Sequence, residues 1–176
     1  MAKYELGETL FTTEEIAVRV RNLARQISKD YGGEEILMVG ILKGAFVFLA
    51  DLARCLTTPV RFDFISCSSY GSATKTSGVI RLHKDQDVDI AGRHVLIVED
   101  IIDTGLTLSY LLKNLEARGP ASLEICSLLN KKHVDGKIDL EIKYEGFAIN
   151  DVFVVGYGMD YDESYRNLPY IATLKK

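Results

Sequence analysis

The sequence predicts an α/β fold, a mostly parallel sheet flanked by helices, and three observations predict it. Short runs of branched apolar residues alternate along the chain with segments of helical period. The run from Val95 to Val98 has no polar member, which is typical of a parallel strand covered on both faces. The 176 residues, 47% hydrophobic and 26% charged, suffice for one substantial core. We therefore expect a single domain over residues 1–176.

The elements follow in order from local patterns. Thr12 to Glu15 offers a capping box for a first helix, and the apolar stripe of that helix is Ile16, Val20, Leu23 and Ile27. The strands expected are 35–41, 60–66, 95–98, 123–129 and 152–155, and two further helices are expected at 45–56 and 108–115. Residues 68–77 are small or polar and show no hydrophobic period, which predicts a mobile loop.

Composition narrows the classes of protein that the chain can represent. The net charge is −4 and no concentrated Lys/Arg run occurs, which speaks against a nucleic-acid partner. No apolar run approaches the roughly 20 residues of a membrane span, and residues 1–12 lack the pattern of a signal peptide. Three cysteines without a C-x-x-C pair argue against a disulfide framework and a zinc site. We expect a cytoplasmic protein without membrane contact.

Residues 95–107, VLIVEDIIDTGLT, combine an apolar strand with three acids and two threonines. They place acids at the carboxyl end of a buried strand, where open α/β sheets bind ligands. Thr104, Gly105 and Thr107 fall at the amino end of the next helix, which suits a phosphate group. Glu99 and Asp100 would repel phosphate, so they suit sugar hydroxyls or a divalent cation. An ordinary strand-to-helix turn is the alternative, but a helix cap needs one acid and this segment has three.

All thirteen positions resemble the motif with which type I phosphoribosyltransferases bind 5-phosphoribosyl-1-pyrophosphate (PRPP). The resemblance implies the type I fold with a small C-terminal hood and a mobile loop. It implies that Glu99 and Asp100 hold the PRPP ribose and Mg²⁺, and that Asp103 is the general base. The 5-phosphate would be bound by Asp103, Thr104, Gly105, Leu106 and Thr107. Leu106 stands where some relatives carry lysine, so backbone donors would remain for the phosphate.

Other segments resemble the family's elements for the leaving group. The turn Leu42, Lys43 and Gly44 resembles the pyrophosphate-binding turn, although the sequence leaves open whether the Leu42–Lys43 peptide is cis. Arg166 matches an arginine that contacts pyrophosphate, and its fork can pair with two oxygens. Asp160 matches an acid that holds a magnesium ion on the pyrophosphate side. By the same resemblance, Ser69 and Tyr70 in the loop 68–77 would act as a lid that excludes water.

The carboxyl-terminal third resembles the 6-oxopurine branch of the family. Lys131, just past a strand, would donate to the purine O6, where adenine instead offers an amino group. Phe153 would stack on the base, and Val154 would contact it through its backbone. Asp160 lies at the end of the same purine-binding segment. The resemblance implies purine salvage in which PRPP and hypoxanthine or guanine give IMP or GMP and pyrophosphate, with xanthine left open. It also implies a homodimer or homotetramer.

Two other classes of protein share part of this sequence pattern. A regulator could keep the PRPP fold and bind RNA, as pyrimidine attenuation proteins do, but it would need a basic surface. A different nucleotide-binding protein would need its own fingerprint. No G-x-x-x-x-G-K-[ST] occurs, and the segment from Gly156 to Tyr161 lacks the third glycine of the dinucleotide motif. A purine transferase is the preferred interpretation.

Overall fold

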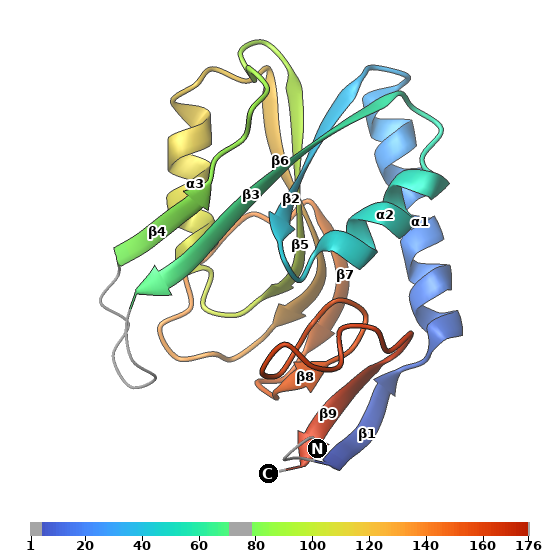
Figure 1. Ribbon diagram of the computed structural model, residues 1–176. Helices are drawn as coiled ribbons and strands as arrows, with labels where there is room; N and C mark the ends of the chain where they lie inside the picture. Colours follow the sequence, from blue (N-terminus) through green and yellow to red (C-terminus); the bar gives the residue numbers. More distant parts are fainter. Residues whose placement is uncertain (1–4, 71–78, 176) are drawn as a thin grey trace.

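The computed structural model describes residues 5–70 and 79–175, which form a large sheet with helices on both faces and a smaller sheet at one end (Figure 1). The elements are β1 Glu5–Phe11, α1 Thr13–Tyr31, β2 Ile36–Leu42, α2 Phe46–Cys55, β3 Val60–Tyr70, β4 Val79–Lys84, β5 His94–Ile102, α3 Leu106–Glu116, β6 Ser122–Lys131, β7 Tyr144–Ile149, β8 Val154–Val155 and β9 Ile171–Lys175.

The large sheet has the strand order β4-β3-β2-β5-β6-β7. Its neighbours are parallel except at one edge, where β4 pairs antiparallel with β3. The predicted fold class, a mostly parallel sheet flanked by helices, is confirmed. All five parallel strands end at the same edge of the sheet. The candidate site residues at the carboxyl ends of β2, β5 and β6 therefore lie along that edge.

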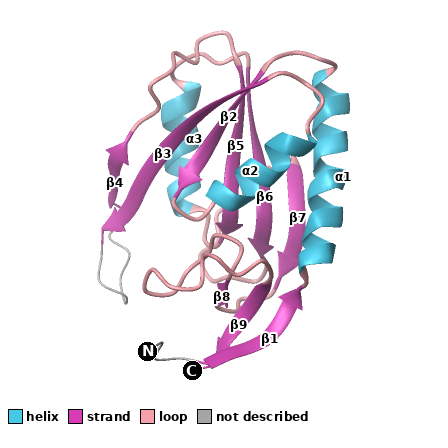
Figure 2. Ribbon diagram, turned by 45° about the vertical axis from the view of Figure 1, so that its right-hand side comes forward, coloured by secondary structure: helices cyan, strands magenta, loops and turns pink. Residues whose placement is uncertain are grey.

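Successive residues of the central strands serve different faces of the sheet. Ile36 and Met38 of β2 enter the cluster beneath α1 and α2, whereas Leu37 and Val39 enter the cluster beneath α3. Figure 2 shows α1 and α2 on one face of the sheet and α3 on the other. Burial on both faces explains why these strands read as continuous apolar runs.

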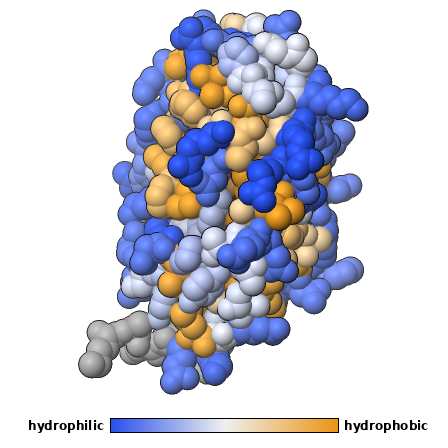
Figure 3. All heavy atoms as spheres, turned by 90° about the vertical axis from the view of Figure 1, so that its right-hand side faces the viewer, coloured by the Kyte–Doolittle hydropathy of each residue, from blue (hydrophilic) through white to orange (hydrophobic). Residues whose placement is uncertain are grey.

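Helix α1 begins where the sequence predicts. The N–H of Glu15 donates to Thr12 Oγ1 (3.2 Å), and the N–H of Thr12 donates to Glu15 Oε2 (2.8 Å), so the capping box is complete. The four predicted stripe residues are all buried. On the opposite side of the helix, Arg21, Arg25 and Lys29 are exposed, and this face of the molecule shows hydrophilic side chains with hydrophobic ones between them (Figure 3).

The smaller sheet, with the order β1-β9-β8, forms the hood beyond the carboxyl ends of the parallel strands (Figures 1 and 2). The prediction that residues 152–155 add a strand to the parallel sheet is wrong. Only Val154 and Val155 are extended, and they pair antiparallel with β9. The chain's first strand also belongs to the hood, because β1 pairs antiparallel with β9. Two segments at opposite ends of the sequence therefore pair within the hood.

Other elements depart from the sequence pattern. The sequence does not predict strand β7, because Glu145 and Gly146 interrupt its apolar pattern. A Cβ at Gly146 would lie 2.2 Å from the carbonyl oxygen of Leu128. The close pairing of β7 with β6 therefore requires glycine at this position. Strand β3 extends to Tyr70, so the first three residues of the predicted mobile loop are strand. Residues 71–78 of that loop lie outside the described residues. None of the helices within 5–70 and 79–175 has the length and apolar content to span a membrane.

The buried carboxylate of Asp63 on β3 should make the stability of the fold sensitive to acid. Its carboxylate is 5% exposed and accepts hydrogen bonds from the N–H groups of Phe64 (2.7 Å), Asp87 (2.7 Å) and Val88 (2.9 Å). Burial alone would raise the pKa of Asp63, but these N–H groups and the Lys84 ammonium outweigh it and lower the pKa below its ordinary 3.8. A lowered pKa stabilises the fold above the unfolded-state value, and that stability is lost as pH falls through the folded-state pKa.

We therefore expect Asp63→Asn to lose about 1–3 kcal/mol of unfolding free energy at pH 7, because one or more buried N–H groups lose an acceptor. Urea unfolding at pH 7 and at pH 3 measures this. The difference between the two proteins should shrink at the lower pH, and a difference that is independent of pH would contradict the ionised role of Asp63. Asp135→Asn, at an exposed loop carboxylate, is the control.

Candidate active site

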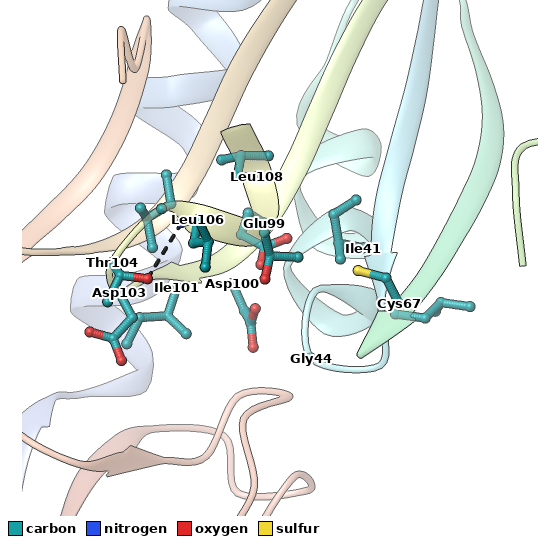
Figure 4. A pocket seen from close by; sticks show the side chains of 14 residues that line it. Ile41, Gly44, Cys67, Glu99, Asp100, Ile101, Asp103, Thr104, Leu106 and Leu108 are labelled. Atoms are coloured by element: carbon teal, nitrogen blue, oxygen red, sulfur yellow. Dashed lines mark hydrogen bonds between the residues drawn. The ribbon is translucent and has the colours of Figure 1, made fainter. Parts of the chain in front are cut away.

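Two adjoining cavities lie at the carboxyl ends of the parallel strands. The first, about 230 Å³, is lined by Ile41, Leu42, Gly44, Cys67 and residues 99–108 (Figure 4). The second, about 190 Å³, is lined by Asp100, Ile101, Asp103, Lys131, Val152, Phe153, Val154, Met159 and Asp160. Asp100, Ile101 and Asp103 line both cavities, so a molecule filling the two would pass directly over Asp103.

The first cavity is bounded by the amino end of α3. Gly105 is the N-cap residue in the left-handed conformation (φ 79°), and the helix begins at Leu106. Thr104 Oγ1 accepts a long hydrogen bond from the N–H of Leu106 (3.4 Å), drawn as the dashed line in Figure 4. The Thr104 carbonyl is tied to the loop before β7 by the N–H of Ile138 (2.8 Å). Because the first N–H groups of a helix lack intrahelical acceptors, this end suits an anion.

Glu99 and Asp100 lie within strand β5, which continues past the expected strand 95–98 to Ile102. Burial, reinforced by the neighbouring Asp100, raises the pKa of Glu99 well above its usual range, and Glu99 Oε2 is buried without a hydrogen-bond partner among the described residues. Burial also raises the pKa of Asp100 to about 6, against the lowering effect of backbone N–H groups and Arg166. Two desolvated carboxylates, one of them with an oxygen that has no hydrogen-bond partner among the described residues, favour a ligand that brings hydroxyl groups or a cation.

The pyrophosphate candidates converge from two elements. The Leu42–Lys43 peptide is cis, which the sequence left open. Lys43 Nζ lies 3.0 Å from Glu163 Oε2, and Arg166 Nη2 lies 2.8 Å from Asp160 Oδ1 and 3.4 Å from Glu163 Oε1. Both cations therefore meet the carboxylate of Glu163, in an exposed ion pair in the case of Lys43.

Gly44 sits where no side chain fits. A Cβ on Gly44 would lie 1.8 Å from Asp100 Oδ2, and a Cβ on Gly158 of the hood would lie 2.1 Å from the Gly44 carbonyl oxygen. Figure 4 shows the Gly44 turn beside the Asp100 carboxylate. The turn is packed between β5 and the hood, so its peptide groups are presented to the cavity at a fixed depth.

The second cavity combines an aromatic face with a buried cation. Phe153 is 49% exposed, and its ring meets Tyr161 edge-on at 5.7 Å between centroids. The Lys131 side chain is only 10% exposed, and its ammonium lies 3.5 Å from Asp103 Oδ2 and 2.8 Å from Asp151 Oδ1. An exposed ring beside a desolvated donor suits a flat polar heterocycle.

The structure brings most of the predicted residues to these two cavities. Lys43 and Arg166 stand at the rim through their ion pairs and line neither cavity. The side chains of Ser69 and Tyr70 lie outside what the structure describes. Sequence reasoning missed Asp151 and Glu163 as partners of the candidate cations, and it missed Cys67 in the first cavity. The only signal for the two acids was their position: Asp151 directly precedes the expected strand 152–155, and Glu163 lies between Asp160 and Arg166.

The carboxylates fit Mg²⁺ as partial ligands. Within residues 5–70 and 79–175, no three His, Cys, Asp or Glu side chains form a metal site. Magnesium commonly takes one or two protein carboxylates and completes its shell with water and substrate phosphates. The unpartnered oxygen of Glu99 beside Asp100 offers such a partial site.

Comparisons with known proteins agree with this geometry. The phosphoribosyl transferase domain model matches residues 7–162. The hypoxanthine-guanine phosphoribosyltransferase of Mycobacterium avium is 49% identical over 97% of this chain and 86% of its own length, and that of Bacillus subtilis is 44% identical over 99% and 97%. A crystal structure of a Bacillus anthracis hypoxanthine-guanine phosphoribosyltransferase, 46% identical, superposes with a TM-score of 0.91 over 99% of this chain and 100% of that one. The chain belongs to the phosphoribosyl transferase domain family.

Proposed function

We propose that the protein is a purine-salvage enzyme that transfers the 5-phosphoribosyl group of PRPP to N9 of hypoxanthine or guanine, with xanthine as a third candidate base. The observation that carries this proposal is the pair of joined cavities, one suited to phosphate and the other to a flat base, with Asp103 in the wall between them. The relatives named above as hypoxanthine-guanine phosphoribosyltransferases support the choice of base.

In the first cavity, Thr104, Gly105, Leu106 and Thr107 would hold the 5-phosphate with N–H groups and hydroxyls. Glu99 and Asp100 would accept hydrogen bonds from the ribose hydroxyls or bind Mg²⁺. Bound magnesium supplies positive charge that offsets the charge developing on the departing pyrophosphate. Asp160 is the candidate ligand on the pyrophosphate side.

The leaving group would lie against the turn after β2. The N–H groups of Leu42, Lys43 and Gly44 and the charges of Lys43 and Arg166 would neutralise pyrophosphate as its bond to C1 breaks. Both cations already face this rim, since both meet Glu163. Ser69 and Tyr70 are assigned to a lid by family resemblance, and exclusion of water would protect PRPP from hydrolysis.

The base would fill the second cavity. Phe153 would stack on it, the backbone of Val154 would contact its edge, and Lys131 would donate to O6. As the bond from N9 to C1 forms, Asp103 would take the proton from N7. The protein would act in the cytoplasm as a homodimer or homotetramer, with no nucleic-acid or membrane partner.

A steady-state assay tests the proposal, with magnesium and PRPP offered to hypoxanthine, guanine, xanthine, adenine and uracil while nucleotide and pyrophosphate are followed together. We expect nucleotide from hypoxanthine or guanine and none from adenine, because Lys131 presents a donor at the position of O6, where adenine carries an amino group. We expect none from uracil, because this single-ring base has no N7 from which Asp103 could take a proton. Turnover of adenine or uracil alone would overturn the assignments of Lys131 and Phe153. PRPP binding without transfer to any base would favour the RNA-binding regulator.

A further inference from the structure

Lys131 is held between two carboxylates that come from different elements. Asp103 belongs to the turn after β5, and Asp151 belongs to the segment between β7 and β8. The two carboxylates are more than half exposed, at 57% and 58%, whereas the Lys131 side chain is 10% exposed. The ammonium is therefore the desolvated member of the group and depends on its partners.

The two contacts differ in kind. Lys131 Nζ donates a hydrogen bond to Asp151 Oδ1 at 2.8 Å, whereas its contact with Asp103 Oδ2, at 3.5 Å, is an ion pair without a hydrogen bond among the described interactions. An ammonium has three donors and no acceptor, so one proton is committed to Asp151 and the others stay available. Asp151 is thus the nearer and the hydrogen-bonded partner of the ammonium.

We infer that Asp151 is a positioning residue for the base: it holds the Lys131 ammonium where it can donate to the C6 oxygen of a 6-oxopurine, and it keeps that ammonium from closing onto Asp103. The inference rests on the proposed function, since it deepens the role given there to Lys131. Asp151 acts through Lys131 and lines neither cavity.

The fold fixes the register of this pair. Lys131 pairs with Ile149 across β6 and β7, and the N–H of Lys132 donates to the Ile149 carbonyl (2.7 Å). Asp151 follows Ile149 by two residues, so strand pairing delivers its carboxylate beside the end of β6. Lys137 also donates to the carbonyl of Lys131, which anchors the backbone below the ammonium. The geometry is thus set before a base arrives.

Neutralising Asp151 should leave Asp103 as the nearest charge to the ammonium. In Asp151→Asn, the Lys131 ammonium would move onto the Asp103 carboxylate. The base would then have neither the ammonium as a donor to its O6 nor the Asp103 carboxylate as an acceptor. Binding of PRPP uses the other cavity and should not change. The expected pattern is an increase of about tenfold in KM for hypoxanthine with a fall in kcat, while KM for PRPP stays as in the parent.

The experiment compares Asp151→Asn, Asp151→Glu, Lys131→Met and the double variant Lys131→Met/Asp151→Asn, with Asp135→Asn as the matched control at an exposed carboxylate four residues after Lys131. Steady-state constants for hypoxanthine and PRPP and a melting curve are measured for each. If Asp151 acts through Lys131, the double variant is no worse than Lys131→Met alone. Asp151→Glu should recover most of the loss, since it restores the charge.

Two results would overturn the inference in distinguishable ways. If Lys131→Met is impaired toward hypoxanthine but Asp151→Asn behaves like Asp135→Asn, or if the losses of the double variant simply add, Asp151 is not a positioning residue and the proposed function stands. If Lys131→Met uses hypoxanthine normally, the role proposed for the lysine falls, and the inference falls with it.

Discussion

Asp103→Asn should reduce nucleotide synthesis by about 10²- to 10⁴-fold, the range typical of a lost general base. The carboxamide has the shape of the carboxylate but cannot take the N7 proton of the base. Asp103 lines both cavities, so its position suits proton transfer at the point where ribose and base meet. Steady-state assays with hypoxanthine and PRPP measure the loss.

Binding of PRPP separates a chemical role from a structural one. The 5-phosphate would be held by the N–H groups and hydroxyls of residues 104–107, which the substitution leaves in place, so the dissociation constant for PRPP should change little. Titration calorimetry measures it, with Asp135→Asn as the control. Equal losses in PRPP binding and in transfer would point to a structural or metal-holding role for Asp103 and contradict its role as base.

The local part of the site could be read from the sequence because its chemistry is contiguous. A buried strand, two acids and a turn that suits phosphate follow one another in residues 95–107. The structure places the strand and the acids in β5 and the turn at the start of α3, and residues 99–107 line the first cavity. The capping box of α1 was predictable for the same reason, since Thr12 and Glu15 are one helical turn apart. Local spacing decides local geometry.

The hood could not be predicted in detail because its pairing is non-local. Strand β1 meets β9 across almost the whole chain, with Glu5 opposite Lys175, and β8 has only two residues. No periodicity in a short segment specifies a partner at that distance. The same limit hid Asp151 and Glu163, whose importance lies in side chains that only the folded chain brings to Lys131, Lys43 and Arg166.

Gly44→Ala should remove pyrophosphate and PRPP binding with a loss of at least about a hundredfold in kcat/KM for PRPP, because displacement of a binding group by about 1 Å can cost that much. The added methyl would lie 1.8 Å from Asp100 Oδ2, 2.5 Å from its Cγ and 3.0 Å from Oδ1. Asp100 belongs to a central strand and is half-buried, and on the other side Gly158 leaves no room for the Gly44 carbonyl to retreat. The turn must therefore move out of its present place in the wall of the first cavity.

The comparison that isolates this effect is Gly92→Ala, at the opposite end of the sheet. Its added methyl would meet nothing within 4 Å, but Gly92 has φ +69°, so the variant carries backbone strain without a collision. We expect Gly92→Ala to lose a little stability and no activity, whereas Gly44→Ala loses pyrophosphate affinity by calorimetry and melts about 2–12 °C lower, the range for an overpacking cost of about 1–3 kcal/mol. A Gly44→Ala enzyme with normal pyrophosphate affinity would show that Asp100 yields to the methyl group. The close contact between the turn and Asp100 would then not be the reason that glycine occupies position 44.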